Sequence, residues 1–349
     1  MRIRVLITLA ICLFLLQSFA GNHARTHAAA PAGYHVIDKV KLGGEGGWDC
    51  LIVDSKARRI YISRSTHVMV VDMDTEKVVG DIPKTNGVHD IAVVPDLGKG
   101  FISNGRDNSV SVFDLKTLVV SKQIPVGKNP DVIIYDPASK TVFTCNGASK
   151  DVTAIDPKNE TVRGTIPLDA RPEFAVSDDN GHLYINLEDK SAIAAIDSRK
   201  MTVEARWPLA PGEEPTGLAI DRKHHRLFAA CANKLMAVVN ADNGHLITTL
   251  PTGSGADGAE FDASSQTAFN PNGGDGTLTV IHEDSPDKFS VVENVPTQRG
   301  ARTMTLDPKS HKLFLITAEF GPPPAPTAER PRPRPSIIPG SFTLLVVGK

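Results

Sequence analysis

The sequence is poor in aromatic side chains and has almost no excess of charge of either sign. Phe, Trp and Tyr make up 5% of its 349 residues, and 38 Lys and Arg residues nearly balance 40 Asp and Glu residues. The formal net charge of −2 gives no long-range field that would attract nucleic acid or an anionic membrane. Few aromatic side chains are available to stack on unpaired bases. We therefore expect no nucleic-acid partner.

Several short motifs that indicate particular chemistry are also absent. The chain has no Cys-x-x-Cys-His sequence for covalent haem, no Gly-x-Ser-x-Gly nucleophile turn and no Gly-rich phosphate loop. Its histidines show no His-Glu-x-x-His spacing of a zinc protease. These absences exclude electron-transfer propellers with covalent haem and argue against hydrolases with a Gly-x-Ser-x-Gly nucleophile and against phosphate-loop proteins, so no cofactor is assigned.

The only long apolar run in the sequence lies at the N-terminus, over residues 5–16. Two arginines precede it, and the small-residue pattern Ser18-Phe19-Ala20 follows it, which is the order of a secretory signal peptide. The run is too short to span a bilayer of ~30 Å as a helix. We predict a signal peptide over residues 1–20, with cleavage as late as residue 30. The mature protein is then periplasmic or secreted and has no membrane span.

Cysteine is scarce as well. The predicted mature chain retains three cysteines, Cys50, Cys145 and Cys231, and an odd number cannot be fully paired within one chain. They fall in alternate units of the repeat described next, which are not neighbours. We expect them to be small buried hydrophobic residues, with a reactive or metal-binding role as the alternative.

Internal repetition is the dominant feature of the sequence. Residues 86–96, 128–137 and 171–178 each contain a turn, an apolar segment and a second turn rich in Asp, Pro, Ser or Lys. The residues that open the apolar segments are Asp49, Asp90, Asp131, Glu173, Thr216, Gly258 and Arg302. Their intervals are 41, 41, 42, 43, 42 and 44 residues. Short segments rich in Val, Ile, Thr and Phe at this period indicate four-stranded β-propeller blades.

The repeats predict an all-β fold, a seven-bladed β-propeller that forms a single domain over residues 34–349. In blade 2 we predict strands at 90–94, 100–103, 109–114 and 119–125. The last repeat lacks an outer strand, whereas residues 34–42 resemble one. We therefore predict that this N-terminal strand pairs into blade 7 and closes the ring, which removes exposed sheet edges.

Individual strands also resemble those of a known family. Arg-Ile-Tyr-Ile-Ser (59–63), Gly-Phe-Ile-Ser-Asn (100–104) and His-Leu-Tyr-Ile-Asn (182–186) are similar to the "YVTN" strand. Gly-Thr-Ile-Pro-Leu (164–168) is similar to the outer strand of the same family. The chain resembles the YncE-like, YVTN-repeat β-propellers of bacterial periplasms and surfaces. The resemblance implies a seven-bladed ring and, for most relatives, a binding or scaffolding role without catalysis.

Polar residues gather at one predicted face of the propeller, where the loops between blades open beside those that join second to third strands. The candidate binding residues at this channel mouth are Asp49, His89, Asp90, Asp131, Glu173, Asp257 and Arg302. In one interpretation each carboxylate bonds the amides of its own turn. In the other, the carboxylates converge and recruit a cation, for which oxygen ligands favour Ca²⁺ or Mg²⁺. His224 and His225 fall in a turn on the opposite face.

The segment 320–340, inserted in blade 7, is the one compositional anomaly. Its alternating prolines favour an extended chain. Arg330, Arg332 and Arg334 would then either cover the acidic mouth as a lid or form a partner-docking arm, with a solvated loop as the remaining alternative.

These features together predict an exported, non-catalytic propeller that binds a partner protein or a small ligand on its channel face. We expect a monomer and assign no catalytic residue. The alternative is an enzyme, a lactonase-like hydrolase or a metal-dependent lyase that uses the acidic mouth. His89 beside Asp90 makes a weak general-base pair, because adjacent residues of a strand point to opposite sides.

Overall fold

The computed structural model describes residues 33–325, 327 and 335–349. The predicted signal peptide and Arg330, Arg332 and Arg334 of the insertion lie outside these residues. Gly33–Lys349 forms one compact unit of β-strands. The helical segments of the described chain are three short 3₁₀ turns, η1 (Pro95–Leu97), η2 (Gly105–Asp107) and η3 (Glu188–Lys190). Among the described residues, no helix has the length and hydrophobicity needed to cross a membrane.

Blades 1 and 2 share one long strand, β5 (Val78–Val94), which is the outer strand of blade 1 and continues as the inner strand of blade 2. The other strands of blade 1 are β2 (Leu51–Asp54), β3 (Arg59–Ser63) and β4 (Ser65–Asp72). Those of blade 2 are β6 (Lys99–Asn104), β7 (Ser109–Asp114) and β8 (Val120–Pro125). The predicted boundaries of the blade 2 strands are therefore confirmed to within one residue. The exception is the start of the inner strand, which has no boundary of its own because it continues from blade 1 within β5.

Blades 3, 4 and 5 are regular four-stranded antiparallel sheets in chain order. Blade 3 comprises β9 (Pro130–Asp136), β10 (Thr141–Asn146), β11 (Asp151–Asp156) and β12 (Thr161–Pro167). Blade 4 comprises β13 (Pro172–Ser177), β14 (His182–Leu187), β15 (Ala192–Asp197) and β16 (Thr202–Pro208). Blade 5 comprises β17 (Pro215–Asp221), β18 (Arg226–Cys231), β19 (Leu235–Asn240) and β20 (Leu246–Pro251).

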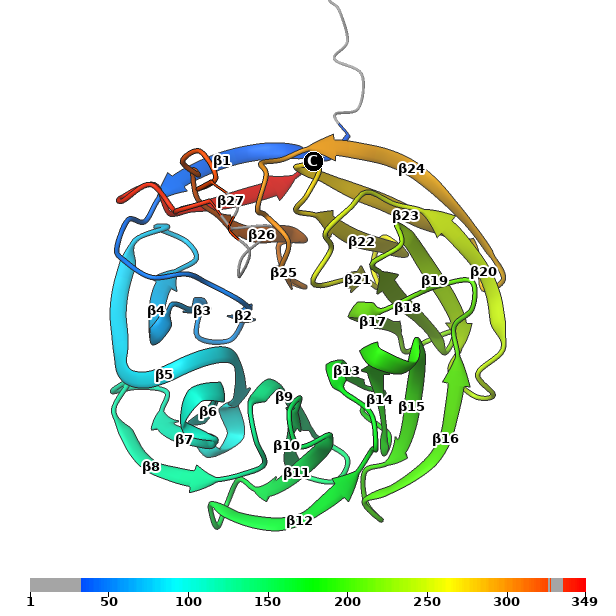
Figure 1. Ribbon diagram of the computed structural model, residues 1–349, viewed down its shortest axis with the longest axis horizontal. Helices are drawn as coiled ribbons and strands as arrows, with labels where there is room; N and C mark the ends of the chain where they lie inside the picture. Colours follow the sequence, from blue (N-terminus) through cyan, green and yellow to red (C-terminus); the bar gives the residue numbers. More distant parts are fainter. Residues whose placement is uncertain (1–32, 326, 328–334) are drawn as a thin grey trace, which may run out of the picture. The chain divides into compact units, whose positions relative to one another are not determined.

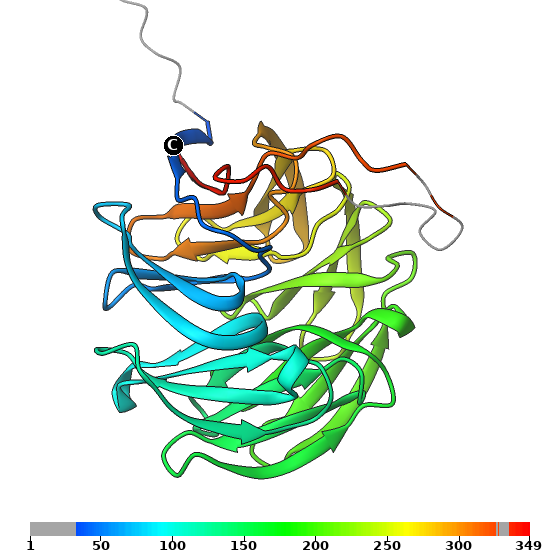
Figure 2. The ribbon, with the colours of Figure 1, turned by 60° about the vertical axis from the view of Figure 1, so that its left-hand side comes forward.

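Blade 7 is completed by the N-terminal strand, which confirms the predicted closure. Blade 6 precedes it, with β21 (Glu260–Asp262), β22 (Thr267–Asn272), β23 (Thr277–Ser285) and β24 (Lys288–Pro296). Blade 7 comprises β25 (Met304–Asp307), β26 (Lys312–Thr317), β27 (Thr343–Gly348) and β1 (His35–Lys41), and the N- and C-terminal strands lie side by side (Figures 1 and 2). Their pairing runs from His35 opposite Gly348 to Lys41 opposite Thr343.

The hydrophobic core lies between blades rather than at the centre of the ring. Seven clusters of buried side chains occupy the seven interfaces between neighbouring blades. Between blades 3 and 4, for example, Phe143 and Ile166 share a cluster with Leu183 and Ile196. Alternate residues of each strand point to opposite faces of a blade, so every blade contributes to two interfaces. The sheets surround a central axis with their inner strands closest to it (Figure 1).

The three cysteines of the described chain are all buried and free. Cys145 belongs to the cluster between blades 3 and 4, and Cys231 to the one between blades 4 and 5. Burial raises the pKa of each of these two thiols, which keeps them protonated. The expected role as small hydrophobic residues is confirmed for Cys145 and Cys231, whereas Cys50 is buried at the edge of the cavity at the channel mouth.

Candidate functional site

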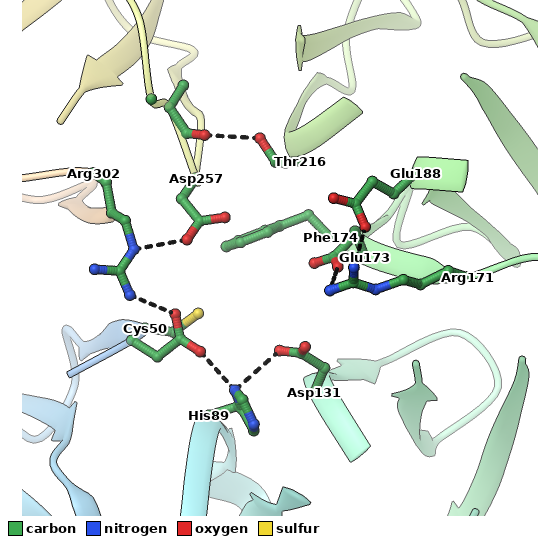
Figure 3. A pocket seen from close by; sticks show the side chains of 13 residues that line it. Cys50, His89, Asp131, Arg171, Glu173, Phe174, Glu188, Thr216, Asp257 and Arg302 are labelled. Carbon is green, nitrogen blue, oxygen red and sulfur yellow. Dashed lines mark hydrogen bonds and ion pairs between the residues drawn. The ribbon is translucent and has the colours of Figure 1, made fainter. Parts of the chain in front are cut away.

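One residue of each blade occupies the same register position near the start of the inner strand or just before it. In blade 1, Asp54 pairs with Arg59 of the second strand, and Asp49 lies five residues before Asp54. In each of the other blades we likewise take the inner-strand residue that pairs with the start of the second strand and count back five residues. The residues found in this way are His89, Asp131, Glu173, Thr216, Asp257 and Arg302. We call these seven residues the mouth ring. All of them line one cavity of about 540 Å³ (Figure 3).

The register corrects the position of Asp90. The sequence repeat aligned Asp90 with Asp49, but His89 is the true equivalent, and a shift of one residue turns a strand side chain to the other face. Asp90 is 5% exposed and is not among the residues that line the cavity. Its carboxylate accepts hydrogen bonds from the backbone N–H of Ile91 (2.8 Å) and of Ile133 in blade 3 (3.1 Å). Asp90 therefore connects two blades instead of facing the channel.

Five members of the mouth ring form a chain of alternating charge across blades 6, 7, 1, 2 and 3. Arg302 donates from Nε to Asp257 (2.8 Å) and from Nη2 to Asp49 (3.2 Å). The other oxygen of Asp49 lies 2.6 Å from Nδ1 of His89. That nitrogen also lies 3.5 Å from Asp131. In this row of charged side chains, Arg302 and His89 therefore each contact two carboxylates.

A second charged group, from blade 4, lines the other side of the cavity. Arg171 contacts Glu173 through Nη2 and Glu188 through Nη1, both at 2.7 Å. Thr216, the mouth-ring residue of blade 5, is neutral and donates its hydroxyl to the carbonyl of Ala256 (2.9 Å). The two charged groups are thus separated by an uncharged residue on one side and by the gap between Asp131 and Glu173 on the other.

The cavity contains two more carboxylates than cations. Its carboxylates are Asp49, Asp131, Glu173, Glu188 and Asp257, and its cations are Arg171, Arg302 and protonated His89. The excess affects Asp131 and Glu173 of neighbouring blades, since burial and the charge of Asp131 raise the pKa of Glu173 against the lowering effect of Arg171. Without a ligand, protons therefore supply part of the missing positive charge.

The same charges also determine the pKa values of Asp131 and His89. Burial raises the pKa of Asp131 to about 6, against the lowering effect of His89. Burial alone would lower the pKa of His89, but the hydrogen bond with Asp49 and the charge of Asp131 raise it to about 9. His89 is therefore protonated at neutral pH and stabilises its two carboxylate partners.

The two interpretations of the acidic residues can now be separated residue by residue. Asp90 bonds the backbone amide of the adjacent Ile91, as the first interpretation expected, although this amide lies in β5 and not in a turn. Within the described chain, the hydrogen-bond partners of the Asp49 and Asp257 carboxylates are side chains instead, namely His89 and Arg302. Four carboxylates of the mouth ring thus converge on the cavity, as the second interpretation expected.

The donor set of the mouth ring fits Ca²⁺ or Mg²⁺ poorly. Donor atoms of Asp49, His89 and Asp131 lie within 4.8 Å of one another. The imidazole nitrogen is placed between the two carboxylates, however, and both ions prefer oxygen ligands. An internal ion pair accounts for this group better than either ion does.

Sequence reasoning missed Arg171 and Phe174 as lining residues. Arg171 lies two residues before Glu173 in the sequence and Phe174 follows it directly, and this proximity to a predicted site residue was the available signal. Figure 3 shows the ring of Phe174 reaching into the space between the charged groups. The cavity thus combines carboxylates with a half-buried aromatic ring.

Comparison with known proteins supports the fold. No protein-family model matches the chain, and no curated protein sequence matches it. A solved chain of Kuenenia stuttgartiensis hydrazine synthase aligns with a TM-score of 0.69 and 18% identity, over 80% of this chain and 94% of that one. A chain from a mitotic checkpoint complex aligns with a TM-score of 0.72 and 13% identity, over 88% of this chain and 96% of that one. By its sheet topology and these likenesses, the chain is an all-β, seven-bladed β-propeller.

Proposed function

We propose that the protein is a non-catalytic β-propeller that binds a small ligand through a positively charged group, such as a protonated amine, at the mouth ring. The observation that carries this proposal is the excess of carboxylates, Asp131 and Glu173 among them, in a cavity that is also lined by the ring of Phe174. An ammonium group would neutralise the carboxylates and would replace the protons that they otherwise retain.

The size and lining of the cavity support a small ligand rather than a protein. Its volume of about 540 Å³ lies within the range of about 300–1,000 Å³ that is common for small-molecule pockets. Phe174 offers an aromatic face to which an organic cation is attracted, by about 0.5–2 kcal/mol depending on solvation. A bare metal ion would gain little from this ring. The chemistry therefore favours an organic ammonium group.

A panel of simple cations tests the proposal. Putrescine, choline and ethylamine should raise the melting temperature of the protein by mass action, whereas the neutral alcohols of matched size should not. Asp131→Asn and Glu173→Gln should each weaken amine binding in calorimetric titrations. Asp96→Asn, at an exposed turn residue outside the cavity, is the matched control and should bind as the wild type does. A response to Ca²⁺ or Mg²⁺ alone would contradict the proposal, as would unchanged amine binding by both mouth variants.

The finer family placement and the cellular location belong to the same proposal. We infer that the chain is a YncE-like, YVTN-repeat propeller, because its second strands carry the similar sequences Gly-Phe-Ile-Ser-Asn and His-Leu-Tyr-Ile-Asn. Export rests on the predicted signal peptide of residues 1–20. N-terminal sequencing of the protein recovered from the periplasm or the medium should find residues 21–31 at the new terminus, and recovery of the uncleaved chain in the cytosol would contradict export.

The short contact between His89 and Asp49 supports a second candidate, the lactonase-like hydrolase or metal-dependent lyase. A pKa of about 9 makes His89 a proton donor at neutral pH rather than a base, which suits acid assistance to a leaving group. Hydrolysis of simple lactones that is lost in His89→Gln would favour this function over ligand binding alone.

A further inference from the structure

A second cluster of ionisable side chains lies at the opposite end of the inner strands, between blades 5 and 6. Asp221 is the last residue of β17, His224 lies in the turn that follows, and Glu283 comes from β23 of the next blade. Asp221 is 2% exposed and Glu283 is 1% exposed. None of the three lines the mouth cavity. The cluster is therefore independent of the proposed ligand site.

The equivalent residues of other blades show which contact this part of the repeat usually makes. Asp136 of blade 3 corresponds to Asp221, because each is the last residue of its inner strand and pairs with the first residue of the second strand. Ser198 of blade 4 corresponds to Glu283, because each directly follows the residue of its third strand that pairs with the start of the second strand. Each also donates its N–H to the carbonyl just before the second strand.

Between blades 3 and 4 the equivalent contact is a hydrogen bond from a donor to an acceptor. The hydroxyl of Ser198 donates to Asp136 (2.7 Å), and that of Ser177 donates to the same carboxylate (2.6 Å). Between blades 7 and 1, Arg58 likewise donates to Asp307 (2.8 Å). The inner-strand Asp thus receives a donor from the following blade.

Between blades 5 and 6 the following blade supplies a second carboxylate instead. Nδ1 of His224 lies 2.7 Å from Asp221 and 2.8 Å from Oε1 of Glu283. A single imidazole N–H cannot make a good hydrogen bond to both. Within the described chain, Oε2 of Glu283 is buried without a hydrogen-bond partner. A buried carboxylate oxygen left unpaired is unfavourable, so this cluster lacks a positive group.

We propose that Asp221, His224 and Glu283 bind a divalent transition-metal ion of the Zn²⁺ type, which joins blades 5 and 6. Their donor atoms lie within 4.8 Å of one another. One imidazole nitrogen and two carboxylates are a common Zn²⁺ donor set, and three protein ligands leave a fourth position for water. Ca²⁺ and Mg²⁺ would instead prefer oxygen ligands throughout. The side chain of His224 is 18% exposed, which leaves the cluster accessible to solvent.

Metal binding would remove the three unfavourable features of the cluster, which are the shared imidazole proton, the unpaired carboxylate oxygen and the repulsion between the two carboxylates. The ion accepts the lone pair of Nδ1 in place of a proton that two carboxylates compete for. It also takes the unpaired oxygen of Glu283 and neutralises the charge repulsion with Asp221. Asp221 keeps the hydrogen bonds that it receives from the backbone of Lys223 (2.9 Å) and His224 (3.1 Å), so its orientation is fixed before the metal binds.

The test uses the full mature chain, stripped with a chelator and titrated with Zn²⁺ in competition with a chromogenic chelator. Co²⁺ serves as a spectroscopic probe of the same ligands. Glu283→Ser and His224→Ser recreate the residues that blades 4 and 3 have at these positions, Ser198 and Ser139. Each should weaken Zn²⁺ binding by more than about tenfold and abolish the Co²⁺ absorption bands of this site. Zn²⁺ should raise the melting temperature of the wild type but not of either variant.

Asp131→Asn distinguishes this site from the mouth ring, because it removes a potential ligand there and should leave Zn²⁺ binding unchanged. Glu283→Gln serves if Glu283→Ser does not fold, since its amide can donate to Asp221 in the absence of metal. The proposal is overturned if the wild type binds neither Zn²⁺ nor Co²⁺, in which case Asp221 and Glu283 share a proton. It is equally overturned if the folded variants at position 283 bind Zn²⁺ as tightly as the wild type.

Discussion

Oδ2 of Asp49 lies 2.6 Å from Nδ1 of His89, so a carboxylate at the start of blade 1 bonds an imidazole at the start of blade 2. Asp131 of blade 3 lies 3.5 Å from the same nitrogen. His89 therefore connects three consecutive blades through a single ring atom. Its charge affects both the stability of the propeller and the electrostatics of the cavity.

The first prediction concerns stability and pH. The pKa of His89, about 9 in the folded protein, lies above the ordinary value of about 6.5. The folded state thus holds the proton more tightly, and the resulting stabilisation is complete below pH ~6.5 and is lost as the pH rises through about 9. In urea unfolding, the wild type should exceed His89→Gln in free energy of unfolding by on the order of 3 kcal/mol at pH 6, and this difference should vanish by pH 10.

The matched control for this experiment is His225→Gln, at an exposed histidine on the opposite face that contacts only Asp242 among the described carboxylates. It should track the wild type across the whole pH range. A difference between wild type and His89→Gln that does not change from pH 6 to pH 10 would show that the charge of His89 does not stabilise the fold.

The second prediction concerns ligand binding and pH. Burial raises the pKa of Asp131 to about 6, so this carboxyl retains part of its proton at pH 5.5 in the empty cavity. A cationic ligand must displace that proton, and amine affinity should therefore increase from pH 5 to pH 7 with proton release. Calorimetry in two buffers of different ionisation enthalpy measures the release. Asp131→Asn should bind more weakly and with a flatter pH profile, and an equally steep profile in this variant would contradict the assignment.

The third prediction separates Asp90 from its neighbours in the ring. Asp90→Ala should lower the free energy of unfolding by about 1–3 kcal/mol, because the N–H groups of Ile91 and Ile133 lose their buried acceptor. Amine binding by this variant should stay at the wild-type level, since Asp90 does not line the cavity. Loss of binding with unchanged stability would instead place Asp90 in the ligand site.

The fold could be predicted because each blade repeats the same strand pattern, and because the incomplete last repeat matched an unpaired strand at residues 34–42. The exact members of the ring were harder to predict, because blade 2 offers the adjacent residues His89 and Asp90. An alignment that favours carboxylates selects Asp90, whereas backbone pairing with the second strand selects His89. Only that pairing determines which of two adjacent side chains faces the channel.

The contacts across blades could not be predicted from the sequence at all. His89 and Asp49 are in contact although they are 40 residues apart in the sequence, and His224 and Glu283 are 59 residues apart. No local pattern specifies such a pair, since it depends on how neighbouring sheets pack. A usable signal did exist for Glu283, which lies in the third strand of blade 6 at the position where blades 4 and 5 have Ser198 and Ala241.

The last prediction concerns the closure of the ring. Deletion of residues 34–42 removes β1, exposes the edge of β27 and removes the contact between Tyr34 and Phe269, whose ring centroids lie 5.1 Å apart. We expect aggregated or unfolded protein, because an exposed strand edge pairs with other chains and the core between blades 6 and 7 loses Tyr34. Tyr34→Ala keeps the strand and should fold, with a lower melting temperature. Size-exclusion chromatography and thermal unfolding measure both effects, and a soluble truncated monomer with an unchanged melting temperature would show that the N-terminal strand is not needed to hold the ring closed.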